Sequence, residues 1–539
     1  MNWRPLLLSL IIFFTVMSLG VLTHLYLASK PNIPPAPTLL TNDQGRDSST
    51  TLTFPDAHIG NFLQDDSSYY HIRVLNSTFL HKPSRNYYGD TAPSHLQTIW
   101  KLFLGKGTTK VGAVEKTWKG AGWTGQPLLV VENGQKYLLQ GAYDHHLKKI
   151  EAATGKVVWQ YKFDDVIKGT GSIWINHQAD SLEDFALILQ GSRAGKSLYA
   201  TTVPSFRAIS LLTGRDRWQL NSVQTHSYSR DVDASALLWN DTAYIGLENS
   251  IFTLLNPDPQ QATLRQGLQQ PQIYRQQDTL YQAVDRITHQ RNLVTEASPT
   301  LLGKRVYISS GAGRVWGYHL EKDSLDWMYF TGADMDGTPV VTADSCLLIT
   351  VEKQYITGRG GVLKLDPSLP PQQAAQWYFP TSDFEFASWQ GGVVGSVAVN
   401  CHYKQEGEPN MAAFVGIDGM LYVVDTDTLV DDFSMPTFDT SLYLPCPQLL
   451  FKHYVGPSIA TPIWVGKQLI VATSKGISRF EWQAAGHTFI FKEKIAIRCE
   501  STPVVDQGRL YIASRNGYLY CLGKVDSSQI TTPIITPSQ

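Results

Sequence analysis

A turn followed by a tryptophan recurs along this chain and constrains its fold more than any other feature. The pattern Thr-Gly-x-x-x-Trp occurs at residues 154–159 and again at 213–218, each time between an apolar segment and an alternating one. Weaker copies surround Trp327 and Trp377, and Trp100 lies in a similar segment near the start. Repetition of this kind predicts a fold built from one repeated structural unit.

A second pattern repeats along the chain: a small residue, often followed by proline, precedes a short aliphatic strand. Pro299 and Pro339 stand about 40 residues apart, as do Pro462 and Pro503. Proline is tolerated at the first residue of a strand because its missing N–H costs least there. With the degenerate copies included, eight such units begin near residues 126, 171, 234, 298, 338, 395, 461 and 502.

Short strands bounded by turns, without a long helical period, indicate an all-β fold. A period near 40 predicts a β-propeller, which we expect to have eight blades over residues 95–523, with seven as the alternative count. A flat sandwich is disfavoured because the repeats extend over roughly 400 residues. The last unit, residues 501–522, lacks a fourth strand, and residues 95–104 form a strand without a unit. Pairing these two segments closes the ring.

The segments at residues 147–159 and 208–218 resemble the repeat of pyrroloquinoline-quinone-like propellers. That family includes quinoprotein dehydrogenases and cofactor-free scaffolds such as the propeller lipoprotein of the outer-membrane barrel-assembly machinery, and this chain resembles the scaffolds more closely. The resemblance implies that the repeated glycines form tight turns and that the tryptophans dock neighbouring blades. The residues expected in this structural role are Trp100, Gly155, Trp159, Gly214, Trp218, Trp327 and Trp377.

Charged residues stand just before the small-residue motifs, a position that faces the central channel of a propeller. They are Lys168, Arg230, Asp231, Asp233, Glu296, Asp334, Asp336, Arg498 and Glu500. Either these charges pair and seal the ring, or the acids bind Ca²⁺ or tune a proton acceptor by crowding. Asp334 and Asp336, in a short D-x-D-G sequence, are the candidate calcium ligands.

The enzymatic alternative is a dehydrogenase that uses pyrroloquinoline quinone and Ca²⁺ to oxidise a small alcohol or sugar. Its candidate base is Asp231, Asp233, Asp334 or Asp336. The resemblance implies two adjacent cysteines over the cofactor in alcohol-oxidising members, and no two of the five cysteines here are adjacent. We therefore expect neither catalysis nor a cofactor.

One long apolar run extends from Leu6 to Ala28 within an N-terminal region of residues 1–30. At about 1.5 Å per residue it can cross roughly 30 Å of hydrocarbon, so we predict a single-pass anchor in the bacterial inner membrane, with the bulk of the protein in the periplasm. The alternative is a signal peptide cut near Gly20, which yields a secreted or periplasmic protein.

Three further segments flank the predicted propeller. Residues 31–57 form a Pro-rich, polar tether, and residues 524–539 form a tail. Residues 58–94 are rich in aromatic side chains and either pack against the ring or cover one of its mouths. Cys499 and Cys521 fall on successive strands and form either a disulfide or two separate buried thiols.

The net charge of the chain argues against one class of partner, nucleic acid. A formal net charge of −2 and a pI near 6.7 provide no basic footprint, so we do not expect nucleic acid binding. Taken together, these features predict a membrane-tethered, non-catalytic scaffold that faces the cell envelope. Its blade loops are expected to bind a protein or a polysaccharide.

Overall fold

The computed structural model describes residues 71–194 and 203–525. The chain divides into two compact units, Met1–Pro55 and Asp56–Gln539, and all described residues belong to the second. The predicted anchor, the tether and most of the predicted C-terminal tail lie outside the described residues. Within the described ranges, no helix combines the length and apolar character needed to cross a membrane.

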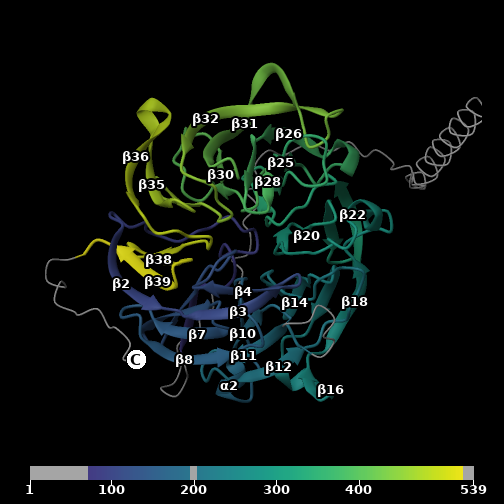
Figure 1. The fold of residues 1–539 in the computed structure, drawn as a ribbon, viewed down its shortest axis with the longest axis vertical. Coiled ribbons are helices and arrows are strands. Elements are labelled where there is room, and N and C mark those ends of the chain that lie inside the picture. Colours follow the sequence, from purple (N-terminus) through teal and green to yellow (C-terminus); the bar gives the residue numbers. More distant parts are fainter. Residues whose placement is uncertain (1–70, 195–202, 526–539) are drawn as a thin grey trace, which may run out of the picture. The chain divides into compact units, whose positions relative to one another are not determined.

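Eight antiparallel sheets surround one axis as the blades of a propeller (Figure 1), which confirms the predicted fold and blade number. In each blade the strand nearest the axis follows the small-residue motif. Strands of blades 1 to 4, from the axis outward, are β5 (Leu128–Glu132), β6 (Gln135–Gly141), β7 (His146–Glu151), β8 (Val157–Lys162); β9 (Ser172–Ile175), β10 (Ala186–Gly191), β11 (Phe206–Ser210), β12 (Asp216–Leu220); β13 (Leu237–Trp239), β14 (Thr242–Gly246), β15 (Ile251–Leu255), β18 (Ile273–Thr279); and β19 (Thr300–Leu302), β20 (Arg305–Ser310), β21 (Arg314–His319), β22 (Ser324–Phe330).

The two ends of the propeller sequence meet in blade 8, as predicted. Trp100 pairs with Cys521 and Lys101 with Tyr520, so β2 lies beside β39 (Figure 1) and supplies the fourth strand of the blade. Strands of blades 5 to 8 are β23 (Val340–Val341), β24 (Leu347–Val351), β25 (Gly361–Leu365), β26 (Ala375–Pro380); β29 (Ala398–Val399), β30 (Met411–Val415), β31 (Met420–Pro436), β32 (Tyr443–Tyr454); β33 (Ile463–Val465), β34 (Gln468–Thr473), β35 (Gly476–Gln483), β36 (Thr488–Ile495); and β37 (Val504–Asp506), β38 (Arg509–Ala513), β39 (Tyr518–Gly523), β2 (Gln97–Phe103).

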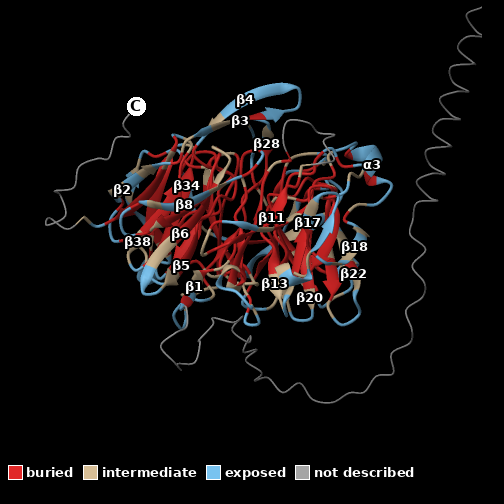
Figure 2. Ribbon diagram, turned by 90° about the horizontal axis from the view of Figure 1, so that it is seen from below, coloured by how far each residue is buried: buried red, intermediate tan, exposed pale blue. Residues whose placement is uncertain are grey.

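Several short strands and helices lie outside the main strands of the blades. Figure 2 shows buried residues filling the blades and an exposed hairpin, β3–β4, on the face that we call the upper face; β1 lies on the opposite, lower face. The additional elements are β1 (Ile72–Asn76), β3 (Lys106–Val111), β4 (Val114–Lys119), β16 (Thr263–Arg265), β17 (Leu268–Gln270), β27 (Asp383–Phe386), β28 (Trp389–Gly391), α2 (Leu182–Phe185), α3 (Asp285–Thr288), η1 (Pro259–Gln261), η2 (Pro371–Gln373) and η3 (Ala484–Gly486).

Hydroxyl side chains join the inner strands, which explains why the small residue of the repeat is so often Ser or Thr. The backbone N–H of Ser235 donates to Oγ of Ser298 at 2.9 Å, and the N–H of Ser298 donates to Oγ1 of Thr338 at 3.0 Å. The same bond recurs from Thr338 to Ser396, from Ser396 to Thr461 and from Thr461 to Thr502. Blades 4 to 8 thereby each satisfy a buried N–H of the preceding blade.

The recurrent tryptophans lie against the Thr-Gly turn of the next blade. A β-carbon on Gly214 would stand 2.7 Å from the ring of Trp159, and one on Gly155 would stand 2.8 Å from Trp100. Both glycines have positive φ, 72° and 78°, so the turn requires glycine for its conformation and for its closeness to the indole.

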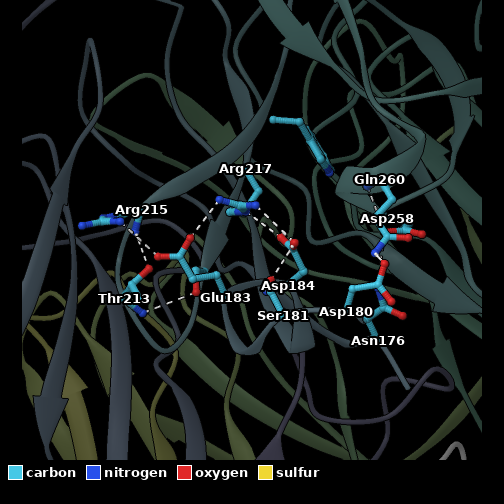
Figure 3. Close-up of polar contacts among 12 residues, drawn as sticks. Asn176, Asp180, Ser181, Glu183, Asp184, Thr213, Arg215, Arg217, Asp258 and Gln260 are labelled. Atoms are coloured by element: carbon cyan, nitrogen blue, oxygen red, sulfur yellow. Dashed lines mark hydrogen bonds and ion pairs between the residues drawn. The ribbon is translucent and has the colours of Figure 1, made fainter. Parts of the chain in front are cut away.

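A polar network holds the inserted loop of blade 2 at its rim (Figure 3). The guanidinium of Arg217 on β12 donates to Asp184 of α2 at 2.6 Å and to Glu183 at 3.0 Å. Gln260 of blade 3 donates to Asp180 at 2.7 Å. This charged patch therefore connects blades 2 and 3 and has a structural role.

All five cysteines are unpaired, so Cys499 and Cys521 are two separate thiols. Burial raises the pKa of the Cys521 thiol to about 12 and also raises the pKa of Cys499. Buried thiols of this kind are inert and serve as small core residues.

Candidate functional site

The segment between β1 and β2 closes the lower side of the ring. β1 pairs with β5 and adds a strand at the axis side of blade 1. The following residues, 76–94, which we call the plug, bond to every blade. Plug partners from blade 1 to blade 8 include Pro127, Ser172, Ser235, Pro299, Val341, Val399, Arg479 and Gly508.

Arg85 is the centre of the plug and is fully buried. Its guanidinium donates to the carbonyl of Pro299 at 2.7 Å, to the carbonyl of Phe79 at 2.6 Å and to Oγ1 of Thr78 at 2.8 Å. Burial lowers its pKa to about 9, so the group stays protonated at neutral pH. The positive charge is held by carbonyl dipoles, which closes this end of the axis to other ligands.

Two groups of acids gather nearer the upper face. In each group the carboxylate oxygens lie within 4.8 Å of one another; one comprises Asp233, Glu248 and Glu296, and the other Asp334, Asp336 and Glu352. Four of these six acids occupy predicted positions before the inner strands. Glu248 and Glu352 were not predicted; they follow the second strand of their blades, β14 and β24.

The structure brings six of the predicted charged residues together: Lys168, Asp231, Asp233, Glu296, Asp334 and Asp336. Lys168 forms an ion pair with Asp233 and lies 3.9 Å from Glu296. Asp231 accepts from Arg193 at 2.7 Å, and Arg193 also reaches Thr109 of β3. The cluster therefore lies below the β3–β4 hairpin.

The other three predicted residues are held elsewhere. Arg230 donates to the carbonyls of Ser222 and Val203, both in blade 2 segments. The side chain of Arg498 is 59% exposed and lies 3.5 Å from Glu500. Glu500 is 3.2 Å from Arg515. These three charged residues therefore do not seal the axis of the ring by pairing with one another.

Crowding and burial raise the pKa values of the acids. Burial first, and the neighbouring acids next, raise the pKa of Asp336 to about 7, and burial raises the pKa of Asp334 to about 7. Burial also raises the pKa values of Glu248, Glu296 and Glu352 well above the usual range. At neutral pH the cluster thus carries protons that free carboxylates would have lost.

Removing one acid is expected to change how stability depends on pH. Because folding raises the pKa of Asp336 from 3.8 to about 7, the protonated carboxyl contributes fully to the stability of the fold below about pH 4. This contribution to stability is lost as pH rises to about 7. Between pH 5 and pH 8 the free energy of unfolding of Asp336→Asn should therefore rise by about 3 kcal/mol relative to that of wild type. Denaturant unfolding in the presence of a chelator measures this difference.

The comparison between variant and wild type is needed because buried histidines act in the opposite direction. Burial lowers the pKa of His81 to about 3, so this group destabilises the fold as pH falls below its ordinary value of 6.5. An equal pH dependence in Asp336→Asn and wild type would contradict the raised pKa of Asp336.

A cluster of apolar side chains lies beside the acids. Trp123 packs with Val394, Ile417 and Ile459, and with Trp389 of the β27–β28 hairpin. The end of that hairpin is bonded to the acid cluster, since Gly392 forms a β-bridge with Glu352. The upper side of the axis thus combines acidic groups and aromatic side chains from different blades.

The charges of this site do not fit the quinone that the enzymatic alternative requires. Pyrroloquinoline quinone carries three carboxylates, so its site needs available cations. The two cations of the acid cluster, Lys168 and Arg193, are already paired with Asp233 and Asp231.

A ring of eight blades, seven with four strands and one with five, closed by pairing of its two ends and docked by tryptophans on Thr-Gly turns, defines a pyrroloquinoline-quinone-like β-propeller. A family model described as outer membrane protein assembly factor BamB matches residues 97–368, about half of the chain. The chain therefore belongs to this family.

Two solved structures are similar to the chain. The crystal structure of BamB from Moraxella catarrhalis is 13% identical, with a TM-score of 0.49, and the match covers 80% of this chain and 100% of that chain. The crystal structure of the computationally designed Ika8 protein is 9% identical, with a TM-score of 0.43, and covers 76% and 100%. A comparison with curated proteins finds no match.

Proposed function

We propose that this protein is a non-catalytic scaffold of the bacterial cell envelope that binds a protein partner during assembly of outer-membrane proteins. Membership of the family described as outer membrane protein assembly factor BamB carries this proposal. The run from Leu6 to Ala28 tethers the propeller to the inner membrane, with the bulk in the periplasm. The plug, which bonds to the blades beneath the axis, leaves partner binding to the outer surface and the upper face.

The long hairpin of blade 6 is the surface that we assign to the partner. Its strands, β31 and β32, have 17 and 12 residues, and β31 continues well beyond its pairing with β30. The exposed apolar side chains on the hairpin are Leu429, Val430, Phe433, Tyr443, Leu449 and Tyr454. Gathered aromatic and aliphatic side chains are typical of protein interfaces and provide their binding energy.

Replacing Phe433 and Tyr443 together with serine is expected to weaken partner binding at least about 30-fold, because aromatics at the centre of an interface contribute at least about 1 kcal/mol each. In a strain lacking the gene, we expect less folded outer-membrane β-barrel protein, measured by its heat-modifiable migration in gels. Wild type should restore the amount, and F433S/Y443S should not.

The matched control exchanges two aromatics of similar exposure on blades 3 and 4, Tyr274 and Phe330, for serine. This control should restore assembly as wild type does. If deletion of the gene leaves folded barrels unchanged, the proposed function is wrong. If F433S/Y443S restores assembly fully, the hairpin is not the partner surface.

A further inference from the structure

Blade 5 contains a compact group of three acids, Asp334, Asp336 and Glu352. The first two lie in the loop before β23, and the third follows β24. One carboxylate oxygen from each lies within 4.8 Å of the other two. Three oxygens at this spacing can share one bound ion.

Neighbouring amides orient two of the three carboxylates. Nδ2 of Asn292 donates to Oδ2 of Asp334 at 2.9 Å, and Nε2 of Gln354 donates to Oε2 of Glu352 at 3.3 Å. The second oxygen of each acid, Oδ1 of Asp334 and Oε1 of Glu352, is buried without a hydrogen-bond partner. Outer amides that fix one oxygen and leave the other free are the usual support of metal ligands.

A hydroxyl beside the group is also buried without a partner. Thr350 is 1% exposed, and its Oγ1 has no hydrogen bond. It lies 1.8 Å from the place that a β-carbon on Gly337 would occupy, directly after Asp336. Glu352 follows β24 two residues after Thr350, and side chains two residues apart along an extended segment point to the same side. An unpaired buried hydroxyl is costly unless another group or a ligand satisfies it.

Within the described chain these three acids lack a basic partner in direct contact, although the charge of Lys168 acts on Asp336 from a distance and favours its ionised form. Among residues 71–194 and 203–525, no lysine or arginine forms an ion pair with Asp334, Asp336 or Glu352. The adjacent acid group differs, since Lys168 pairs with Asp233 there. Buried charge requires a compensating partner, and the donors that contact Asp334 and Glu352 from Asn292 and Gln354 are neutral amides.

We propose that Asp334, Asp336 and Glu352 bind a calcium ion. Calcium takes several oxygen ligands in flexible geometry, and three carboxylates with a nearby hydroxyl match that preference. The group contains no histidine or cysteine, which zinc would favour. The ion would join the loop before β23 to the end of β24 and, through the bridge from Glu352 to Gly392, to the β27–β28 hairpin. Its role is structural and independent of any cofactor.

Full-length protein freed of metal with a chelator is titrated with calcium chloride, using calorimetry and thermal unfolding. Wild type is expected to bind one equivalent and to unfold at a higher temperature with calcium. Asp336→Asn should lose at least about tenfold in calcium affinity. In chelator it should unfold at or above the wild-type temperature, because one repelling charge is gone; this separates ligand loss from misfolding.

Glu500→Gln is the control, since Glu500 is another charged residue near the axis but is paired with Arg498 and Arg515. It should bind calcium as wild type does. Absence of calcium binding at millimolar concentration overturns the proposal and leaves the acids sharing protons. Unchanged calcium affinity in Asp336→Asn overturns it as well.

Discussion

Replacing Trp218 with alanine is expected to lower the free energy of unfolding by about 3 to 5 kcal/mol. The indole is fully buried, packs 5.7 Å from the ring of Phe206, and donates from Nε1 to the carbonyl of Pro257 at 2.8 Å. Because Pro257 belongs to the next blade, the substitution opens a cavity between blades and leaves a carbonyl unpaired. The midpoint of denaturant unfolding measures the loss.

Two further variants separate packing from hydrogen bonding in that site. Trp218→Phe keeps most of the buried area but removes the N–H donor, so it should cost about 1 to 2 kcal/mol. Leu264→Ala, on the 74% exposed side chain of the neighbouring β16–β17 hairpin, should change stability by less than about 0.5 kcal/mol. A loss in Trp218→Ala no larger than in Leu264→Ala would show that this tryptophan does not dock the blades.

The ring could be predicted from the sequence because each of its devices repeats. The Thr-Gly turns and the Ser-Pro or Thr-Pro strand starts recur in register, so blade number and closure followed from counting. Counting the repeats does not explain why the small residue carries a hydroxyl. The bond from Ser298 to Thr338 provides the reason. The hydroxyl is selected because it accepts the N–H of the preceding blade, a contact between residues that are distant in sequence.

The acid cluster was predicted only in part, and the residues that were missed show why. Glu352 reaches the axis from the end of a second strand, whereas the repeat pattern predicts channel-facing charges only in the loop before each first strand. An acid within two residues of the end of the second strand, as in Glu248 and Glu352, is the signal that would have found both. The opposite case is Arg230, whose long side chain reaches the carbonyls of Ser222 and Val203. The position of a residue in the repeat predicts where its backbone lies. The length of its side chain then determines where the charged group lies.

The plug could not be placed from its sequence because it has no period. Its order comes from single contacts with many blades, such as the bond from the N–H of Val399 to the hydroxyl of Tyr88 at 3.0 Å. The aromatic side chains in this segment were nevertheless a sound indication of packing, since Phe79 and Tyr88 are buried. Because the plug occupies the lower side, we expect a partner to bind the hairpins instead.

Replacing Arg85 with alanine is expected to lower the free energy of unfolding by about 3 to 5 kcal/mol. The change leaves the carbonyls of Phe79 and Pro299, both bonded to the guanidinium, without these donors and opens a cavity beneath the inner strands. Arg85→Met should cost nearly as much, because it restores volume but no donor. Arg73→Ala, at an exposed position on β1, is the control and should change stability by less than about 0.5 kcal/mol. Since the plug bonds to all eight blades, we expect Arg85→Ala to shift the whole unfolding transition to lower denaturant. An early, separate transition with the main midpoint unchanged would show instead that the plug detaches from a ring that is stable without it.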